Sequence, residues 1–387
     1  MPQATLLAII YLAFISLGLP DSVVGVAWPA MRLSLEQPVA AAGLVTFTVT
    51  ACTVVSSLAN AAVLRRLGTG PVVVISGVLT GLGLLGFALS PSLAWVLVSA
   101  VPLGLGAGSV DAGLNHFVAD HYSSRHMNWL HACWGVGATI GPLIMGAALL
   151  GAGGWQGGYM VLGTLQLALA LLFLATLGLW RQAKAASTAR GSPDADGRAS
   201  RRQVPGWAAW LAPALFVVYA TAEIGTGLWT ASILVEGRGF DPSTAGLWVA
   251  CFFGAITGGR FAIGLVSARL GNRRLVRLGL WTAIVGAGIF AIPGLPAFVS
   301  LAGLVLLGLG GAPIYPSLMH ETTVRFAPVV ARKVVGRQVA FAALGAAVGP
   351  ACLGLLGAQV GLGAIMPAIL LALALLLVLS AWLDRVT

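Results

Sequence analysis

The sequence has few charged residues for its length. Only 8% of its 387 residues are Asp, Glu, Lys or Arg, whereas a soluble domain carries roughly 25%. A water-facing surface cannot be built from so few charges, so lipid must cover most of the exterior. The scarcity of charge therefore excludes a soluble globular protein and predicts a protein embedded in a lipid bilayer.

Cysteines are also few, and none of them forms a recognisable pattern. The four of them lie inside apolar stretches, and their spacing fits neither a zinc site nor a disulfide framework.

The net charge of +10 comes from short basic clusters between apolar runs and not from one continuous polar face. We therefore expect no nucleic-acid partner. The opening residues MPQATLLAII lack a basic n-region and an A-x-A cleavage site, so we expect them to form a retained first helix.

Apolar residues are plentiful: they make up 58% of the chain, and the mean hydropathy is +0.96. About 20 apolar residues suffice to cross a bilayer as a helix. Segments of at least about that length recur twelve times and predict an all-α membrane protein with twelve transmembrane helices. They lie at about 4–31, 39–64, 71–90, 93–119, 128–150, 157–180, 207–235, 243–267, 275–294, 297–319, 334–357 and 361–383.

One long polar stretch, residues 181–206, separates the first six segments from the last six. It has six Lys/Arg, two Asp and no large apolar residue before Val204, as expected of a flexible linker. The sequence thus predicts a first bundle over 1–180, a cytoplasmic linker over 181–206 and a second bundle over 207–387. If the N-terminus is cytoplasmic, 18 of the 21 Lys/Arg fall on the inner side, as the positive-inside rule requires.

The two halves repeat one another. In the second segment of each half, Ala42-Gly43-Leu44 and Arg66-Leu67-Gly68 match Ala245-Gly246-Leu247 and Arg269-Leu270-Gly271 at one constant offset of 203. In the fourth segment the offset is 204, which pairs Asp111 with Tyr315. In the first segment it is 202, which pairs Asp21 with Glu223. Such repeats predict two pseudo-symmetric six-helix bundles and are typical of alternating-access carriers, whose solute site lies near mid-bilayer.

Four charged residues fall inside predicted spans: Asp21, Asp111, Glu223 and Arg260. Each would cost several kcal/mol in hydrocarbon unless it is paired or faces water, so each is a candidate functional residue. We interpret Asp21, Asp111 and Glu223 as proton-coupling groups, because burial favours the protonated carboxyl. Structural ion pairs or helix caps are the alternative for the acids. Arg260 is interpreted as an intramembrane charge partner of one of them.

Polar and aromatic residues near these charges suggest a site for a hydroxylated solute. Amide and imidazole groups offer donors and acceptors to hydroxyls, and aromatic rings offer flat apolar faces. Packing or an interfacial aromatic belt is the alternative for the aromatic residues, and Asn128 could instead cap a helix. The candidate solute-binding residues are Asn115, Asn128, His131, Trp28, Trp134, Glu223, Trp229, Tyr315 and Gln338.

Motifs for enzymatic chemistry are missing. The sequence has no G-x-S-x-G, P-loop or H-E-x-x-H, so it predicts neither an enzyme nor a bound cofactor. Histidines recur every five residues at 116, 121, 126 and 131, but five is not a same-face helical spacing. We therefore expect no metal site.

The loop RRLGTGP and its repeat GLVSARLGNRR resemble the inner-loop signature of the major facilitator superfamily, although both lack its usual acid. GLGAGSVDAGLNHFV and RHMNWLHACWGVGA are most similar to the fucose:proton symporter-like sugar transporters. That resemblance implies that Asp111 stands for a protonated glutamate, Asn115 and Asn128 for two asparagines, and His131 for a glutamine. It also makes Asp21 the candidate for an aspartate in the first helix.

These observations lead to a hypothesis about function. The chain is expected to be a monomeric, proton-coupled symporter of a sugar or similar small polar solute in a bacterial-type inner membrane, with both termini cytoplasmic. The run GATIGPLIMG also resembles a motif of drug:proton antiporters, so a proton-driven exporter of drugs or metabolites is the alternative. A non-transporting membrane receptor is a third possibility.

Overall fold

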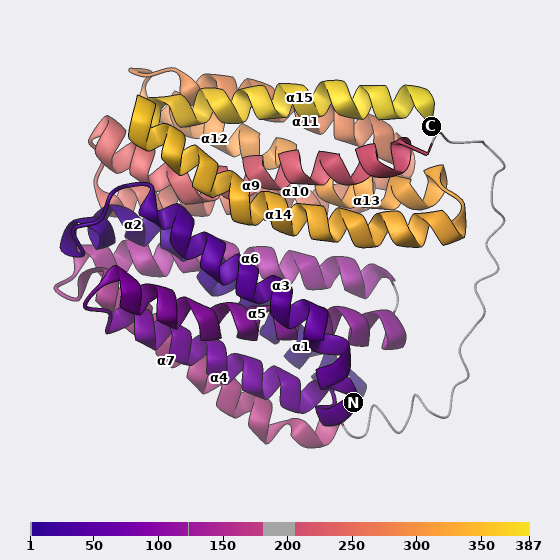
Figure 1. Ribbon diagram of the computed structural model, residues 1–387, viewed down its shortest axis with the longest axis horizontal. Helices are drawn as coiled ribbons and strands as arrows, with labels where there is room; N and C mark the ends of the chain where they lie inside the picture. Colours follow the sequence, from indigo (N-terminus) through magenta and orange to yellow (C-terminus); the bar gives the residue numbers. More distant parts are fainter. Residues whose placement is uncertain (1, 123, 181–205) are drawn as a thin grey trace. The chain divides into compact units, whose positions relative to one another are not determined.

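The computed structural model describes residues 2–122, 124–180 and 206–387, and in this part of the chain the regular structure is helical (Figure 1). Twelve helical spans are long and apolar enough to cross a membrane, one for each predicted segment. The first half contains α1 (Pro2–Asp21), α2 (Val23–Ser34), α3 (Ala41–Leu67), α4 (Thr69–Ala88), α5 (Leu93–His121), α6 (Ser124–Leu150) and α7 (Gly154–Ala175). The second contains α9 (Ala208–Arg238), α10 (Pro242–Leu270), α11 (Asn272–Ala291), α12 (Ala297–Gly311), α13 (Ile314–Arg325), α14 (Pro328–Val360), η1 (Leu362–Ala364) and α15 (Ile365–Val386).

Two of the twelve spans are each built from two α-helices. The first is interrupted at Ser22, just after Pro20, where the missing proline N–H removes a helical hydrogen bond. It then continues without a break through Pro29. The tenth span, predicted as one segment, is interrupted between Gly311 and Ile314, where Pro313 again lacks an N–H. Each break lies within a few residues of a candidate functional residue.

The described chain divides into two compact units. Unit 1 comprises residues 1–37, 44–194 and 242–250, and unit 2 comprises 38–43, 195–241 and 251–387. The predicted linker lies outside the described residues except for its last residue, Gly206. Unit 2 thus includes a few residues from the start of α3, and unit 1 includes the first residues of α10.

Close helix packing in unit 1 depends on glycine. α1 packs along α6, because Gly18, Gly137 and Gly141 let the two backbones approach. A Cβ at Gly137 would overlap the carbonyl oxygen of Ile15, and one at Gly141 would overlap that of Leu19. These contacts fix the register of α1 against α6.

Unit 2 uses the same contacts at the equivalent positions. α9 lies along α14, where a Cβ at Gly345 would overlap the Val217 carbonyl oxygen and one at Gly349 would overlap the Thr221 side chain. The first spans are related by the offset of 202 given above, and the fifth spans by an offset of 208, which also matches Gly141-Pro142 with Gly349-Pro350.

Other helix pairs repeat as well. In unit 1, α4 packs on α5 and α7; in unit 2, α11 packs on α12 and α15. A Cβ at Gly106 would lie 2.7 Å from the Ser76 carbonyl oxygen, and one at the equivalent Gly310 would lie within 2.5 Å of that of Gly279. The predicted fold of two pseudo-symmetric bundles is therefore confirmed.

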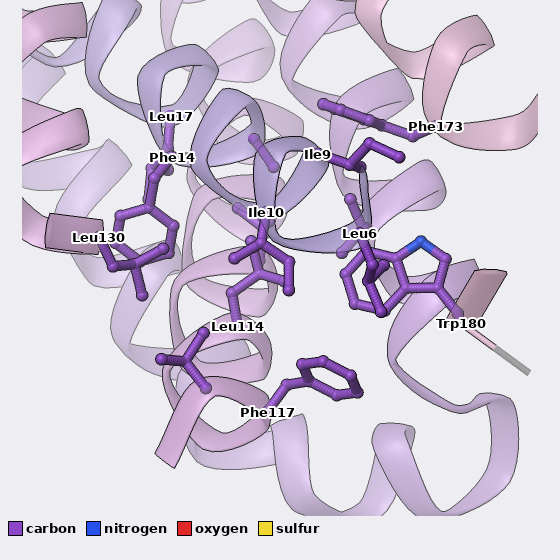
Figure 2. Packing of buried hydrophobic residues seen from close by; sticks show 14 of the residues in the cluster. Leu6, Ile9, Ile10, Phe14, Leu17, Leu114, Phe117, Leu130, Phe173 and Trp180 are labelled. Carbon is purple, nitrogen blue, oxygen red and sulfur yellow. The ribbon is translucent and has the colours of Figure 1, made fainter. Parts of the chain in front are cut away.

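An apolar core closes one end of unit 1 (Figure 2). Side chains from α1, α4, α5, α6 and α7 meet in it, together with the segment that follows α7. They include Leu6, Ile10, Phe14, Val73, Leu114, Phe117, Leu130, Phe173 and Trp180.

Candidate functional site

Asp21 lies at the last residue of α1, beside α6. The neighbouring Ser22 hydroxyl donates to the Ala138 carbonyl at 2.7 Å, which ties the helix break to α6. The indole Nε1–H of Trp134, on the same helix, donates to Asp21 Oδ2 at 2.7 Å. The Asp21 side chain is exposed, and no Lys or Arg forms an ion pair with it among the described residues. A charge in a membrane span is tolerated where it meets water, so this face of unit 1 can bind a polar partner or a proton.

Asp111 lies on α5 and is held by its own helix. Asn115 Nδ2, one turn further along, donates to Asp111 Oδ1 at 2.9 Å and to its carbonyl oxygen at 3.0 Å. Asp111 also lies within electrostatic reach of Asp21. Unit 1 therefore holds two predicted coupling acids, each with a neutral hydrogen-bond donor as its partner.

Three further predicted residues lie on α6 of the same unit. His131 is exposed, and its ring meets the edge of Phe14 at a centroid distance of 5.8 Å. Trp134 is only partly buried and uses its one polar atom to bind Asp21. The side chain of Asn128 is outside the described residues. The structure thus places Trp134 at the candidate site of unit 1.

Unit 2 carries an ion pair instead. Arg260 Nη2 on α10 donates to Glu223 Oε1 on α9 at 3.1 Å, and the two side chains are 17% and 10% exposed. The Tyr219 hydroxyl, one turn before Glu223, also interacts with both charged groups and donates to the Gly311 carbonyl at 2.9 Å. Arg260 is therefore ion-paired with an acid, as the sequence analysis predicted. Glu223 therefore has an ion-pair partner, which Asp21 and Asp111 lack among the described residues.

A small cavity lies beside this pair. It has a volume of about 20 Å³, room for about one water molecule, and is lined by Tyr219, Glu223 and Thr226 among others. Tyr315, the predicted aromatic residue just past the break in the tenth span, packs against Phe216 with ring centroids 4.9 Å apart. It also lies 6.2 Å from the Tyr219 ring and within electrostatic reach of Arg260.

Three predicted solute contacts are buried. Trp28 and Trp229 have no exposed surface, and Gln338 is 1% exposed. The Trp229 indole donates to the Pro350 carbonyl at 2.9 Å, and Gln338 Nε2 donates to the Thr322 hydroxyl at 2.7 Å. No solute reaches these groups in this conformation, so we reassign all three to packing. The sequence pattern could not separate an inward face from one turned toward a solute, because both favour aromatic and amide residues.

The sequence analysis did not predict two features of unit 2: the position of Tyr219 beside Glu223, and a group of charged residues at one end of the unit. Tyr219 could have been found, because it lies four residues before Glu223 and so shares its helix face. Five charged residues at one end of unit 2 also interact: Arg273, Arg277, Glu321, Arg325 and Asp384. Only the i, i+4 spacing of Glu321 and Arg325 signalled them, since the rest come from distant helices. Within the described residues, no three His, Cys, Asp or Glu side chains are grouped to hold a metal.

The repeated six-helix units and the acids in their spans define a polytopic membrane transporter. A family model described as Major Facilitator Superfamily matches residues 10–328, and the chain belongs to that superfamily. It is thus a transporter and not an enzyme. None of the curated proteins matches the chain.

Solved structures of two transporters share the fold. One is a bacterial homologue of the human lysosomal transporter Spinster, in an inward-facing and occupied conformation. Its TM-score is 0.79 at 15% identity, over 100% of this chain and 97% of that one. The other is a mutant of the nucleoside transporter NupG, with a TM-score of 0.75 at 13% identity, over 97% and 98% of the two chains. At such identities the likeness shows the fold alone.

Proposed function

We propose that this transporter is a proton-coupled symporter that takes up a sugar or similar small polar solute by alternating access of its two halves. The observation that carries the proposal is the pair of acids in unit 1. Asp21 and Asp111 lie in spans of unit 1 within electrostatic reach of one another, and they accept hydrogen bonds from the neutral donors Trp134 and Asn115. Such acids can gain and lose a proton during a transport cycle, because among the described residues no Lys or Arg forms an ion pair with either of them.

The roles then divide between the units. Asp111 and Asp21 load the proton in unit 1, and Asn115, His131 and Trp134 offer polar and aromatic contacts to the solute there. Glu223 with Arg260 forms a fixed pair in unit 2 that can exchange hydrogen bonds with solute hydroxyls, supported by Tyr315. The resemblance to fucose:proton symporter-like carriers supports a sugar. The basic clusters support an orientation with both termini in the cytoplasm of an inner-membrane protein, and we propose a monomer.

The test measures the counterflow of a panel of solutes, and the luminal pH, in proteoliposomes that contain a pH-sensitive dye. We expect one sugar or nucleoside to undergo counterflow and its entry to acidify the lumen. Accumulation of hydrophobic cations by everted vesicles, with alkalinisation on substrate addition, would support the exporter instead. Binding of a solute without counterflow would support a receptor, and either result would reject the symporter.

A further inference from the structure

Three exposed tryptophans lie together where α9 begins and α15 ends. Trp207 immediately precedes α9, Trp210 lies in its first turn, and Trp382 lies in the last turns of α15, on which α9 packs. The rings of Trp207 and Trp382 lie against one another, with centroids 4.8 Å apart and planes tilted by 31°. The three residues are between 43% and 53% exposed, so a large part of each ring is left uncovered.

An arginine stacks on one of these rings. The guanidinium carbon of Arg337, on α14, lies 3.9 Å from the centroid of the Trp210 ring. Phe341, one turn further along α14, packs against the same ring with centroids 6.4 Å apart. A guanidinium that rests on an aromatic face can still donate from its edge, and two of its N–H groups match two oxygens of a phosphate. Trp210 thus positions Arg337 without using its hydrogen-bond donors.

The polar groups of this surface are donors without acceptors. Within the described residues, the Arg337 side chain forms no hydrogen bond or ion pair, and the indole N–H groups of the three tryptophans donate to no acceptor. Two further cations are exposed close by in the sequence: Lys333, one turn before Arg337 on α14, and Arg385, three residues after Trp382 on α15. A group that carries negative charge and several acceptor oxygens complements this set.

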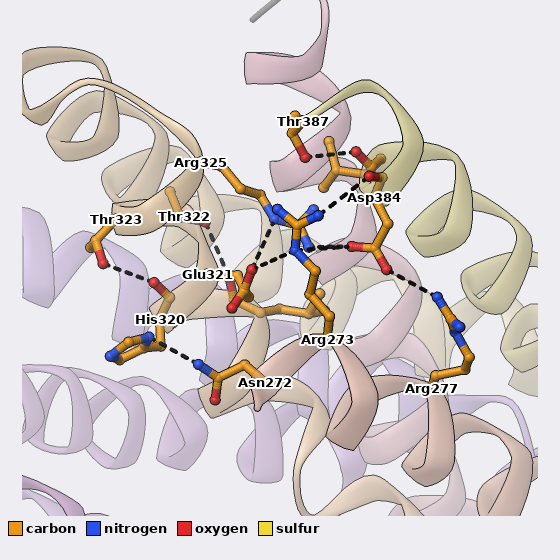
Figure 3. Close-up of polar contacts among 12 residues, drawn as sticks. Asn272, Arg273, Arg277, His320, Glu321, Thr322, Thr323, Arg325, Asp384 and Thr387 are labelled. Atoms are coloured by element: carbon orange, nitrogen blue, oxygen red, sulfur yellow. Dashed lines mark hydrogen bonds and ion pairs between the residues drawn. The ribbon is translucent and has the colours of Figure 1, made fainter. Parts of the chain in front are cut away.

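The acids at this end of unit 2 already have partners. Among the described residues they are Glu321 and Asp384. Figure 3 shows both carboxylates facing arginines: Glu321 Oε2 lies 2.9 Å from Arg273 Nε, and Asp384 is ion-paired with Arg325. No described carboxylate therefore neutralises Arg337, and its counter-charge has to come from another molecule.

The surface lies at the depth where lipid headgroups are expected. α14 has 33 residues and is about 50 Å long, whereas the hydrocarbon core of a bilayer is about 30 Å thick. The first turns of α14, which carry Lys333 and Arg337, therefore extend toward the headgroups, and long basic side chains can reach them from a slightly deeper position. Tryptophan is favoured at this depth because it joins a large apolar ring to one polar N–H.

The fold does not require this surface. At the offsets of 202 and 208 that relate the first and fifth spans, the residues of unit 1 equivalent to Trp210 and Arg337 are Ala8 and Trp129. The glycine contacts nevertheless join α1 to α6 in the same way as α9 to α14. A stacked arginine and tryptophan are thus not needed to hold the helix pair together, and binding of a partner outside the chain explains them.

We propose that this surface binds the phosphate of an anionic phospholipid. Arg337 donates to the phosphate oxygens, and Lys333 and Arg385 add positive charge. The rings of Trp207 and Trp382 pack against the glycerol backbone and the first methylenes of the acyl chains. The lipid site does not depend on which solute the protein carries or on what drives transport. A general interfacial belt would instead attract anionic lipids by net charge alone, with no preference for one cation over another.

The experiment measures the affinity of the purified full-length protein for single lipids by native mass spectrometry. Phosphatidylglycerol is the anionic probe, and zwitterionic phosphatidylcholine with the same acyl chains is the reference. We expect one phosphatidylglycerol to bind about tenfold more tightly than phosphatidylcholine, as one bidentate charge-assisted contact allows. Arg337→Gln should remove most of this preference. Arg274→Gln, at an exposed arginine at the start of α11, changes the net charge equally and should leave the preference in place.

Two further variants separate a defined site from attraction by net charge. Arg337→Lys keeps the charge but loses the planar, stacked guanidinium, so phosphatidylglycerol should bind about threefold more weakly. Trp210→Leu keeps every charge but removes the ring that positions the guanidinium, and we expect a similar loss. Trp281→Leu is its control, at an exposed tryptophan on α11, and should have no effect.

Equal affinity for the two lipids, or an equal loss in Arg337→Gln and Arg274→Gln, overturns the proposal, because either result shows attraction by net charge alone. Inorganic phosphate tests the source of the anion. If it displaces phosphatidylglycerol at equal concentration, the surface binds the free anion and the assignment to a lipid is wrong. The comparison of the two lipids and of phosphate uses the wild-type protein, so it decides the question even if a variant fails to fold.

Discussion

The indole N–H of Trp134 donates to the carboxylate of Asp21 at 2.7 Å. At the equivalent position of the other half, the carboxylate of Glu223 meets the guanidinium of Arg260 at 3.1 Å. The repeat therefore keeps an acid in the first span of each unit but gives it a neutral donor in one and a cation in the other. Among the described residues, Asp21 thus has a neutral hydrogen-bond donor and no ion-pair partner, whereas Glu223 is ion-paired. This difference supports placing proton loading in unit 1.

The Trp134 hydrogen bond should set the pH range of uptake. Trp134→Phe keeps an aromatic ring but removes the N–H that stabilises the charged Asp21 carboxylate, so the protonated form persists to higher pH. We expect the pH profile of solute uptake to move toward higher pH, by up to about one pH unit. Initial uptake rates in proteoliposomes over a pH series measure this.

The control for this prediction makes the same chemical change elsewhere. Trp155 donates its indole N–H to the neutral hydroxyl of Ser34 at 2.9 Å. Trp155→Phe should leave the profile in place. If the pH dependence of uptake by Trp134→Phe is the same as that of the wild type, protonation of Asp21 does not drive uptake.

Asp111→Asn should separate exchange from accumulation. The amide keeps a hydrogen-bonding group beside Asn115 but cannot carry a proton, so solute can cross while the proton gradient no longer drives it. We expect counterflow to persist within about threefold of wild type and uphill uptake, with its acidification signal, to disappear. If the variant still concentrates the solute, Asp111 is not a coupling group. Asp241→Asn, the same chemical change at an exposed residue just before α10, is the control and should still accumulate solute.

Glu223 and Arg260 should depend on one another in their contribution to the stability of the protein. Removing one partner leaves an uncompensated charge with little access to water, which costs about 3–5 kcal/mol in well-buried pairs. Glu223→Gln and Arg260→Gln should each lower the thermal stability of the purified protein. The double variant should be closer to wild type than either single one. Additive losses in a double-mutant cycle of melting temperatures would show that the two charges do not depend on one another.

Much of the fold could be predicted from hydropathy and from the repeat. The twelve apolar segments mark the spans because a helix must bury its backbone polar groups in lipid whatever its neighbours are. The two interrupted spans were harder, since proline can bend a helix or break it. Pro29 lies inside an unbroken helix, whereas Pro313 lies at the break between α12 and α13. Neighbouring packing decides between these outcomes, and a single span does not encode it.

The candidate site was predicted only in part. Isolated charges such as Asp21 and Arg260 are conspicuous because lipid tolerates so few of them. Their partners come from other helices, so the sequence could not show that Trp134 meets Asp21 or that Arg260 meets Glu223. Aromatic residues were the weakest guide. Trp229 looked like a solute contact but is fully buried, because apolar packing and solute binding both favour a large flat ring.

The glycine contacts give a prediction that applies to both halves. A Cβ at Gly137 would overlap the Ile15 carbonyl oxygen, and one at the equivalent Gly345 would overlap that of Val217. Backbone atoms cannot move aside as a flexible side chain can, so α1 would be forced from α6, and α9 from α14. Gly137→Ala and Gly345→Ala should each destabilise the protein by about 1–3 kcal/mol, measured as a lower melting temperature of the purified transporter.

The control for the glycine prediction lies on α14 itself. A Cβ at Gly336 would meet no atom within 4 Å, and alanine is the better helix former there, so Gly336→Ala should be neutral or slightly stabilising. Similar losses at Gly137 and Gly345, with none at Gly336, would show that the repeat preserves the register of its tightest helix pairs. If Gly345→Ala is tolerated while Gly137→Ala is not, then the two pairs are not equivalent in energy. The shared offset would then reflect common ancestry without a shared packing constraint.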